Sequence, residues 1–376
     1  MAFNIVFFQR VPAQYNKTLF EQIGQNENFN LFLIAGNTDQ NEDVKILDEL
    51  SNARLIKVKN HYWRIPYLWY QKEIGNILSE IKPDLIIIQP TPRMVSNFVT
   101  FRWAKINNVP VIGWGMGKMP GLSENKAAIH NFLVKKILQN LDAMICYSTA
   151  SAEYYYILSD RKVQTYVATN VTDDRDTQKQ IAEITREYDL QNLRKELNIP
   201  VNLPVIIFLG RLTAQKRVDD LILAFSKLQE RAFLLIVGDG AYRETLEKIS
   251  LSIKNIIFTG HQVGKNLAKF LLISDIFILP SLGGLAIHQA MSFGLPVIAS
   301  EGDGTEKDLI TDGYNGFLFE KNDFEQMKEK LEFLIDNPEK RKEMGANSLY
   351  LTKNKYSFNN MVTNFENTIL KSLRNH

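Results

Sequence analysis

Short, almost continuously apolar runs recur along the chain and alternate with segments whose apolar residues have helical spacing. Short runs rich in Ile and Val are typical of strands that are buried on both faces of a parallel sheet. Strands that alternate with helices predict right-handed βαβ units and open sheets. The predicted strands form one series at 5–8, 31–35, 85–89, 109–114 and 143–147, and a second at 205–209, 233–237, 256–259, 276–279 and 296–299.

A polar, charged stretch separates the two series and predicts a junction between two domains. We expect an α/β protein of two Rossmann-like domains that face each other across a cleft, with ligands at the carboxyl ends of both sheets. The first domain covers 1–172, a linker region 173–203 and the second domain 204–355. Residues 356–376 predict a last helix, which either belongs to the second domain or crosses back to the first.

The composition adds limits to this picture. Hydrophobic residues make up 45% and charged residues 23%, as in soluble globular proteins, and Lys+Arg 44 balances Asp+Glu 42. The balance argues against a nucleic-acid partner, so any phosphate site must be local. The single cysteine, Cys146, excludes an intramolecular disulfide framework. The sequence lacks signal-peptide features and any run of about 18 apolar residues, so we expect a cytoplasmic protein.

The strongest chemical signal follows the first strand of the second series. Gly210 allows close approach of the backbone, Arg211 can fork onto phosphate oxygens and Lys216 can add a point charge. A helix begins directly afterwards, and its N-terminus adds positive potential. The combination suits a diphosphate whose departure leaves negative charge. The alternative is two solvated cations on a surface loop.

Further blocks follow at 233–240, 258–261, 276–281 and 289–299, and all but 276–281 contain glycine. In this order and spacing they resemble the nucleotide-binding domain of the group 1 (family 4-like) retaining glycosyltransferases, which have the GT-B fold. The resemblance covers about 203–320. It implies that Arg211 and Lys216 hold the donor diphosphate, that Gly238 lies in the family's glycine turn, and that His261 and Val263 lie near the nucleotide base. Without the resemblance, His261 is explained equally well as a histidine of a surface loop that binds no ligand.

The chain departs from the family pattern at a pair of glutamates. The family has E-x7-E before an Ala-Met-x-x-Gly-x-Pro-Val block, whereas here the first Glu is absent and Gln289 has the second position. Gln289 can still bind a ribose hydroxyl. Gly283 and Gly284 can place backbone amides against phosphate. His288 either reaches the site or packs away from it, and packing is the commoner outcome.

A loop at 301–306 offers substitutes for the missing glutamate. Asp303, Glu301 and Glu306 are candidates for binding the donor sugar, and the amides of Gly304 and Thr305 are candidates for the second phosphate. The alternative is that some of these acids cap the following helix.

The first half is expected to bind the acceptor. Arg10, Arg93, Trp114 and Gly115 each follow a predicted strand and are the candidate residues. For Arg10, a structural ion pair is as good an explanation as binding a phosphate. Trp114 either stacks on a sugar or packs in the core. The aromatic segment 61–70 lines a groove, rests on a membrane interface or packs around a helix, and we favour the last.

The resemblance implies an enzyme that transfers a sugar from a nucleotide-diphosphate sugar to a glycan or lipid-linked acceptor, with retention, in surface polysaccharide synthesis. Neither a metal nor a cofactor is obligatory in this reading. A peripheral contact with the inner face of the membrane stays open. The alternatives are a nucleotide-sugar 2-epimerase on the same fold and a degenerate homologue that only binds nucleotide sugar.

Overall fold

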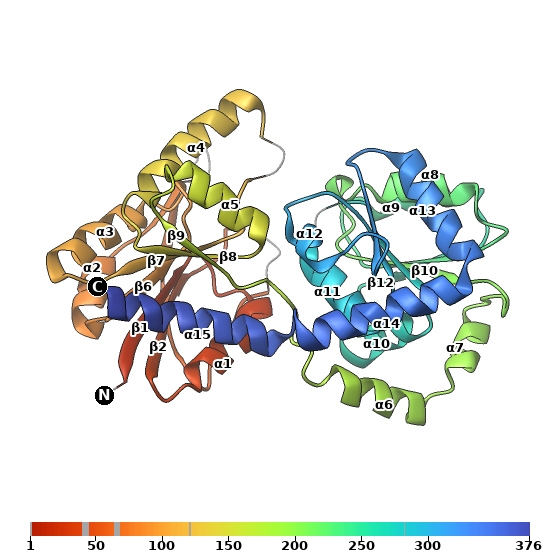
Figure 1. The fold of residues 1–376 in the computed structure, drawn as a ribbon, viewed down its shortest axis with the longest axis horizontal. Coiled ribbons are helices and arrows are strands. Elements are labelled where there is room, and N and C mark those ends of the chain that lie inside the picture. Colours follow the sequence, from red (N-terminus) through yellow and green to blue (C-terminus); the bar gives the residue numbers. More distant parts are fainter. Residues whose placement is uncertain (1, 40–44, 64–67, 120–121, 282) are drawn as a thin grey trace. The chain divides into compact units, whose positions relative to one another are not determined.

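The computed structural model describes residues 2–39, 45–63, 68–119, 122–281 and 283–376 (Figure 1). The chain divides into two compact units: unit 1 comprises Met1–Thr169 and Asn359–His376, and unit 2 comprises Asn170–Phe358. Each unit contains a sheet of parallel strands with helices around it. The predicted α/β class with two Rossmann-like domains is therefore confirmed. The chain passes between the units twice, after Thr169 and after Phe358.

The sheet of unit 1 has seven strands in the order β3-β2-β1-β6-β7-β8-β9. From β1 the chain adds strands towards one edge of the sheet, up to β3, and from β6 onwards it adds them towards the other edge. The switch point therefore lies between β1 and β6. In open α/β sheets, ligands bind beside the carboxyl ends of the strands at such a switch point. The strands are β1 (Phe3–Gln9), β2 (Phe29–Gly36), β3 (Arg54–Val58), β6 (Leu85–Ile88), β7 (Val111–Gly115), β8 (Ala143–Cys146) and β9 (Gln164–Val167).

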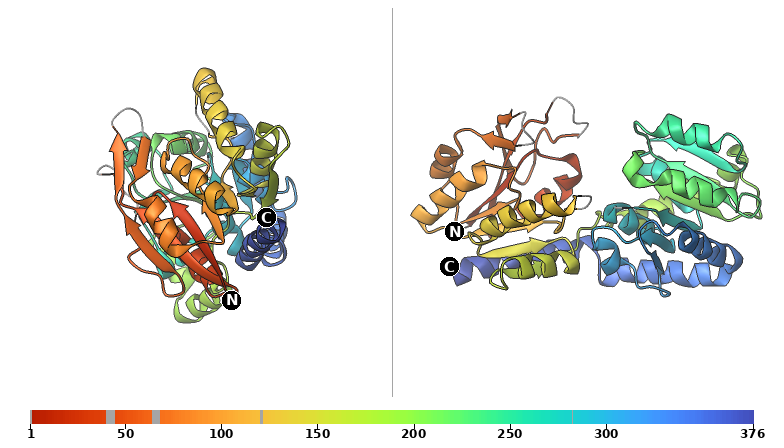
Figure 2. Two further views of the ribbon diagram at one scale, coloured as in Figure 1. Left: turned by 90° about the vertical axis from the view of Figure 1, so that its left-hand side faces the viewer. Right: turned by 90° about the horizontal axis from the view of Figure 1, so that it is seen from above.

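Successive side chains of β1 pack in two different cores, one on each face of the sheet, because strand side chains alternate between the faces of a sheet. Phe7 packs 5.2 Å from Phe20 and 6.4 Å from Phe365, ring centroid to centroid, against α1 (Lys17–Gly24) and α15 (Phe358–Asn375). Val6 and Phe8 belong to the core of the other face. The helices of that second face, also visible in Figure 2, are α2 (Ile74–Ile81), α3 (Ser96–Asn107), α4 (Glu124–Leu138) and α5 (Thr149–Leu158).

The sheet of unit 2 has six strands in the order β12-β11-β10-β13-β14-β15, so its switch point lies between β10 and β13. Its strands are β10 (Val205–Leu209), β11 (Phe233–Val237), β12 (Ile256–Gly260), β13 (Ile276–Leu279), β14 (Val297–Ser300) and β15 (Gly316–Phe319). The helices are α6 (Thr177–Glu187), α7 (Leu190–Glu196), α8 (Val218–Ser226), α9 (Arg243–Ser250), α10 (Gly264–Leu272), α11 (Gly284–Ser292), α12 (Thr305–Leu309), α13 (Phe324–Asp336) and α14 (Pro338–Asn354).

At the domain boundaries, the structure differs from the expected linker at 173–203 and follows one of the two alternatives left open for the last helix, that it crosses back to the first domain. The stretch 173–203, expected to be a linker, lies inside unit 2 and contributes α6 and α7. Ile184 of α6 is fully buried, and α6 packs against α10, so this segment is part of the unit's packing. The last residues, 359–376, belong to unit 1.

The aromatic segment 61–70, expected to pack in the core around a helix, forms an antiparallel hairpin, of which Trp69 packs in the core of unit 1 with residues of α2 and α3. Its strands are β4 (Asn60–Trp63) and β5 (Leu68–Gln71), and residues 64–67 lie outside the described residues. The ring of Tyr70 stacks 5.0 Å from His61 and 5.2 Å from Trp63 on one face of the hairpin. Trp69 points to the opposite face and is buried. The aromatic residues thus follow the period of a strand.

Candidate functional site

The carboxyl ends of β10, β13 and β14 bring together most of the residues expected to bind a donor in unit 2. Gly210 and Arg211 follow β10, the Gly283–Gly284 pair lies between β13 and α11, and Asp303 follows β14. Arg211 is exposed at the end of its strand. The switch-point geometry therefore places these loops next to one another.

Lys216 ends a short 3₁₀ turn, Ala214–Lys216, and its side chain lies at this switch point. A Cβ atom at Gly283 would lie 3.4 Å from Lys216 Nζ, so the ammonium group lies beside the start of α11. Burial lowers the pKa of Lys216, and the nearby Asp303 carboxylate acts in the opposite direction. Lys216 is thus a partly buried cation next to a helix N-terminus.

The start of α11 offers hydrogen-bond donors to the same place. Gly283 has φ +155° and precedes the first helical residue, Gly284, whose missing side chain leaves room for Thr305: a Cβ there would lie 2.6 Å from Thr305 Cγ2. The first amides of a helix have no partner within the helix. The hydroxyl oxygen of Ser281 is buried and has no hydrogen-bond partner in the described part of the chain. These donors and Lys216 suit a phosphate group.

In the loop 301–306, acids that were expected to bind the donor sugar bind backbone amides of the loop itself. The buried Glu306 carboxylate accepts hydrogen bonds from the amides of Gly302 at 2.7 Å and Gly304 at 3.1 Å. Burial raises the Glu306 pKa, and these amides oppose the shift. Asp303 Oδ1 accepts from the Thr305 amide at 3.0 Å. Both amides expected to hold the second phosphate, those of Gly304 and Thr305, therefore already donate to carboxylates of their own loop.

The three candidate acids consequently separate into different roles. Glu306 holds the loop, and Glu301 is exposed and forms an ion pair with Lys307, with Oε2 3.1 Å from Nζ. Asp303 is the acid whose charge acts on Lys216. Of the three, Asp303 is the one that the geometry keeps beside the expected diphosphate.

His288 packs away from the site, in the core of unit 2. It is fully buried, and its Nδ1 lies 3.3 Å from the Thr172 amide and 2.8 Å from Thr172 Oγ1. Its Nε2 lies 2.8 Å from the carbonyl oxygen of Tyr356. An amide can only donate, so Nδ1 accepts and Nε2–H donates, which defines a neutral imidazole. Burial lowers the His288 pKa to about 4.

Gly238 is required by the packing of the fold, and its expected place in donor binding stays a prediction. With φ +145°, it lies so close to the preceding loop that a Cβ atom would be 1.8 Å from the Gly210 carbonyl oxygen. His261 and Val263, expected near the base, are exposed in the loop after β12, and Gln289 is half-buried on α11.

Unit 1 has a cavity of about 440 Å³ at the carboxyl ends of its central strands. Arg10 follows β1, Arg93 follows β6, and Gly115 ends β7, and together with Trp114 all four of the expected acceptor-side residues line it. The other described lining residues are Trp69, Gln89, Pro90, Thr91, Met116, Gly117, Met119, His130, Val134, Tyr147 and Tyr155. Gly115 is required by packing, because a Cβ atom would lie 2.4 Å from Tyr155 Oη.

Trp114 borders the cavity but is mainly a core residue. Only 3% of its surface is exposed, and its ring lies 5.3 Å from Phe365 and 6.2 Å from Phe7, edge-on in both cases. A tryptophan enclosed in this way cannot stack on a sugar without rearranging the aromatic cluster. Of the two expectations for Trp114, the geometry favours core packing.

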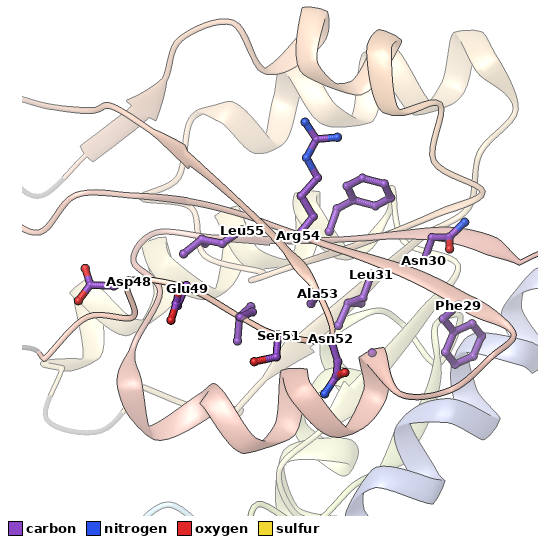
Figure 3. A pocket seen from close by; sticks show the side chains of 13 residues that line it. Phe29, Asn30, Leu31, Asp48, Glu49, Ser51, Asn52, Ala53, Arg54 and Leu55 are labelled. Carbon is purple, nitrogen blue, oxygen red and sulfur yellow. The ribbon is translucent and has the colours of Figure 1, made fainter.

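A shallower hollow of about 690 Å³ lies at the opposite edge of the unit 1 sheet, where β2 and β3 begin (Figure 3). In Figure 3, Asp48 and Arg54 point in different directions, and Asp48 forms an ion pair with Lys57 at 3.5 Å. Ligands of open α/β sheets bind at the carboxyl edge, and this hollow lies at the amino edge. We assign it no role.

Comparisons with known proteins agree with this geometry. Residues 189–349 match the family model "Glycosyl transferases group 1". The sulfoquinovosyl transferase SQD2 of Arabidopsis thaliana is 34% identical over 44% of this chain, which spans about a third of that relative's length (32%). An uncharacterised glycosyltransferase of Methanocaldococcus jannaschii is 25% identical over 92% of this chain and 91% of its own length.

A solved structure of Anabaena HepE in complex with UDP has a TM-score of 0.75, with 16% identity over 98% of this chain and 100% of that one. At this identity the likeness concerns the fold, which is the GT-B fold. Residues 189–349 are thus similar to a group 1 glycosyltransferase domain, the domain of transferase enzymes, and the chain has the GT-B fold. The matches favour a glycosyltransferase over the 2-epimerase.

Sequence reasoning missed His130 and Ser281 at these two sites, and it considered Trp69 only as part of the aromatic segment 61–70. His130 reaches the unit 1 cavity from the middle of α4, and Trp69 reaches it from a hairpin strand. Ser281 lies directly after β13, and its place after a buried strand was a signal that could have found it. No comparable signal marked His130, because the sequence of a helix does not indicate which of its side chains line a cavity.

Proposed function

We propose that the protein is a glycosyltransferase that takes a sugar from a nucleotide-diphosphate donor bound by unit 2 and passes it to an acceptor bound by unit 1. One observation carries the proposal: Lys216 Nζ lies beside the start of α11 at the carboxyl edge of the unit 2 sheet, within the residues that match the group 1 glycosyltransferase model. A cation and helix amides at one point suit a diphosphate. The UDP held by the structurally similar HepE supports a nucleotide as the ligand.

In the proposed reaction, the bond between the sugar carbon and the diphosphate breaks as the acceptor oxygen forms a bond to that carbon. Negative charge grows on the departing diphosphate, and Lys216, Arg211 and the α11 amides stabilise it. The acceptor attacks the face that the diphosphate leaves, so the configuration is retained. A phosphate oxygen takes the proton of the acceptor hydroxyl. These cationic groups supply the positive potential, so the proposal includes no obligatory metal or cofactor.

Asp303 has a positioning role in this proposal. Its carboxylate acts on the charge of Lys216 and also accepts the Thr305 amide, which ties the lysine to the loop after β14. We propose that this arrangement holds Lys216 in place before the donor binds. We also propose that Asp303 takes the place of the family's missing glutamate near the donor sugar.

For the acceptor, we propose a glycan or a lipid-linked glycan of a surface polysaccharide, used at the inner face of the membrane. The support is α4, on which Ile129 is 65% exposed and Phe132 60% exposed. The exposed Lys126 and Lys136 lie on the same helix, and Lys136 Nζ is 5.6 Å from the Phe132 ring centroid. Exposed apolar residues flanked by lysines suit an anionic lipid surface. No helix in the described ranges is long and apolar enough to cross a membrane.

The test of donor binding is calorimetry with UDP, GDP, CDP and ADP on the parent protein and on Lys216→Ala. We expect one diphosphate to bind and Lys216→Ala to cost about 1.5–3 kcal/mol of binding free energy, as for a hydrogen bond to a charged group. Lys248→Ala, an exposed lysine on α9, is the matched control and should bind like the parent. Absence of binding by all four nucleotides would contradict the proposal.

The two alternatives predict different outcomes in an activity assay. A 2-epimerase interconverts donor sugars without an acceptor, whereas a glycosyltransferase releases nucleotide diphosphate faster when its acceptor is present. A degenerate homologue binds the nucleotide sugar but catalyses neither epimerisation nor sugar transfer. Nucleotide release that depends on an added acceptor extract, and that is lost in Lys216→Ala, would separate the proposed function from both.

A further inference from the structure

The cavity of unit 1 has an unusual charge balance. Arg10, Arg93 and His130 line it, and the described lining residues include neither Asp nor Glu. The three basic residues come from separate elements: the end of β1, the loop after β6 and α4. Each therefore approaches the cavity from a different direction. A site with such a lining is electrostatically suited to an anion.

Trp69 connects two of these cations. Its amide donates to the Arg93 carbonyl at 2.9 Å, and its own carbonyl accepts from the Val95 amide at 2.9 Å, so β5 fixes the backbone that carries Arg93. The guanidinium of Arg10 lies 5.5 Å from the Trp69 ring centroid, within the range of a cation–π contact. A displacement of Trp69 would therefore disturb both arginines.

The indole N–H of Trp69 is a donor without an acceptor. The residue is only 8% exposed, and its Nε1 is buried and has no hydrogen-bond partner among the described residues. A buried donor left unsatisfied costs about 1–3 kcal/mol, so such groups usually have a function or a missing partner. Trp69 lines the cavity, where a ligand oxygen can accept this hydrogen bond.

His130 lies close enough to Arg93 to respond to its charge. Burial is the main cause that lowers the His130 pKa, a hydrogen bond with Asn131 opposes it, and the positive charge of Arg93 lowers it further. Two groups that repel each other when both are charged therefore line the same cavity. An anion between them offsets this repulsion.

We infer that the unit 1 cavity binds a phosphate group of the acceptor. A phosphate has enough oxygens to accept from donors on several sides, whereas a carboxylate presents only two. The cavity, at about 440 Å³, lies within the usual range of ligand pockets and has room for a sugar next to the phosphate. This inference rests on the proposed function, in which unit 1 binds the acceptor. It names the chemical class of that acceptor as a sugar phosphate or a phosphate-linked glycan.

The test is calorimetry of the full-length protein with glucose 1-phosphate, in the presence of the nucleotide diphosphate that occupies unit 2. Glucose and glucuronate are the neutral and carboxylate probes. We expect only glucose 1-phosphate to bind well. Arg93→Gln should weaken its binding about tenfold or more, since one charge-assisted hydrogen bond is lost. Trp69→Phe, which removes the N–H and keeps a ring, should weaken it about three- to tenfold.

Arg102→Gln, an exposed arginine on α3 outside the cavity, is the matched control and should leave glucose 1-phosphate binding unchanged. Nucleotide binding in unit 2 and the thermal unfolding of the protein should also stay unchanged in all three variants, which together show that both units are folded. Equal binding of glucuronate, or binding that Arg93→Gln leaves intact, overturns the inference. Both of those results are compatible with normal nucleotide binding, so they are distinct from a failure of the proposed function.

Discussion

Lys216 and Arg217 are neighbours in the sequence, yet their side chains go to different places in unit 2. Lys216 lies beside the start of α11, whereas Arg217 has φ +54° and forms an ion pair with Asp220. Arg217 also donates to Asn322 Oδ1 at 2.6 Å. The left-handed residue turns the chain between the 3₁₀ turn and α8, so that one cation faces the site and the next serves the fold.

The candidate residues around these loops could be predicted to different extents from the sequence. Lys216 and the Gly283–Gly284 pair were identified because each follows a buried strand, where the carboxyl edge of the sheet lies. The role of Glu306 could not be identified, because its carboxylate binds the amides of its own loop. His288 gave no signal that its ring nitrogens meet Thr172 and Tyr356, which are far away in the sequence.

His288 predicts an acid-sensitive stability of unit 2. Its pKa is lowered to about 4 in the folded protein, against an ordinary value of about 6.5. Above about pH 6.5 the imidazole is neutral in both the folded and the unfolded protein, so its full contribution to the free energy of unfolding is present. Between about pH 6.5 and 4 the unfolded chain binds a proton that the folded protein does not, so the free energy of unfolding falls by roughly 3 kcal/mol.

Urea unfolding at several pH values between 7.5 and 4.5 checks this expectation. His288→Gln should be less stable than the parent at neutral pH but should lose less stability on acidification. His261→Gln, at an exposed histidine, should keep the pH dependence of the parent. Parallel curves for the parent and His288→Gln would contradict the assignment.

At the scale of elements, the central strands were the most predictable part of the fold. β1, β6, β10 and β11 are buried on both faces, so their residues are continuously apolar and stand out in the sequence. The edge strands β3 and β9 were missed, because they are only partly buried and carry polar residues. The hairpin β4–β5 was missed because neither its aromatic composition nor its length separates a strand from a helix.

The helix α4 has two faces with different uses. Val134 and Ile137 pack in the core of unit 1, and His130 lines the cavity. Ile129 and Phe132 are mostly exposed. A helix of this kind can rest on a lipid surface while its other face contributes to a binding site.

The α4 surface leads to a prediction about membrane binding. Ile129→Ser/Phe132→Ser should reduce co-sedimentation with vesicles that contain anionic lipid by roughly tenfold or more, because two apolar side chains no longer enter the bilayer. Nucleotide binding should not change. Leu223→Ser is the matched control, since Leu223 is 57% exposed on α8 of unit 2. Equal vesicle binding by all three proteins would show that α4 is not the contact.

At the scale of the whole molecule, the two units repeat one plan. In each sheet the first strand of the series lies at the centre, and the switch point falls beside it. Both candidate sites lie at the carboxyl edges next to these switch points, one with Lys216 and one with Arg10 and Arg93. The repeated plan explains why both sites could be anticipated from the strand pattern alone.

The helix α15 predicts that the last residues of the chain stabilise the unit that contains the first ones. Phe365→Ala should cost about 3–5 kcal/mol, because its ring is buried against Phe7 and Trp114. Hydrogen exchange should rise in β1 and β7 and remain unchanged in β10 and β11. Thr363→Ala, at an exposed position of α15, should have little effect on either unit. Faster exchange in unit 2 alone would contradict this prediction.

The two passages of the chain between the units also decide the order in which the protein can fold on the ribosome. Translation delivers β1 before unit 2 and α15 after it. Phe7, Phe20 and Trp114 therefore lack their contacts with Phe365 until α15 has been made. Unit 2 is complete earlier and can fold while unit 1 still exposes an aromatic surface. During translation, unit 1 is accordingly the unit whose apolar surface stays exposed longer and is open to misfolding.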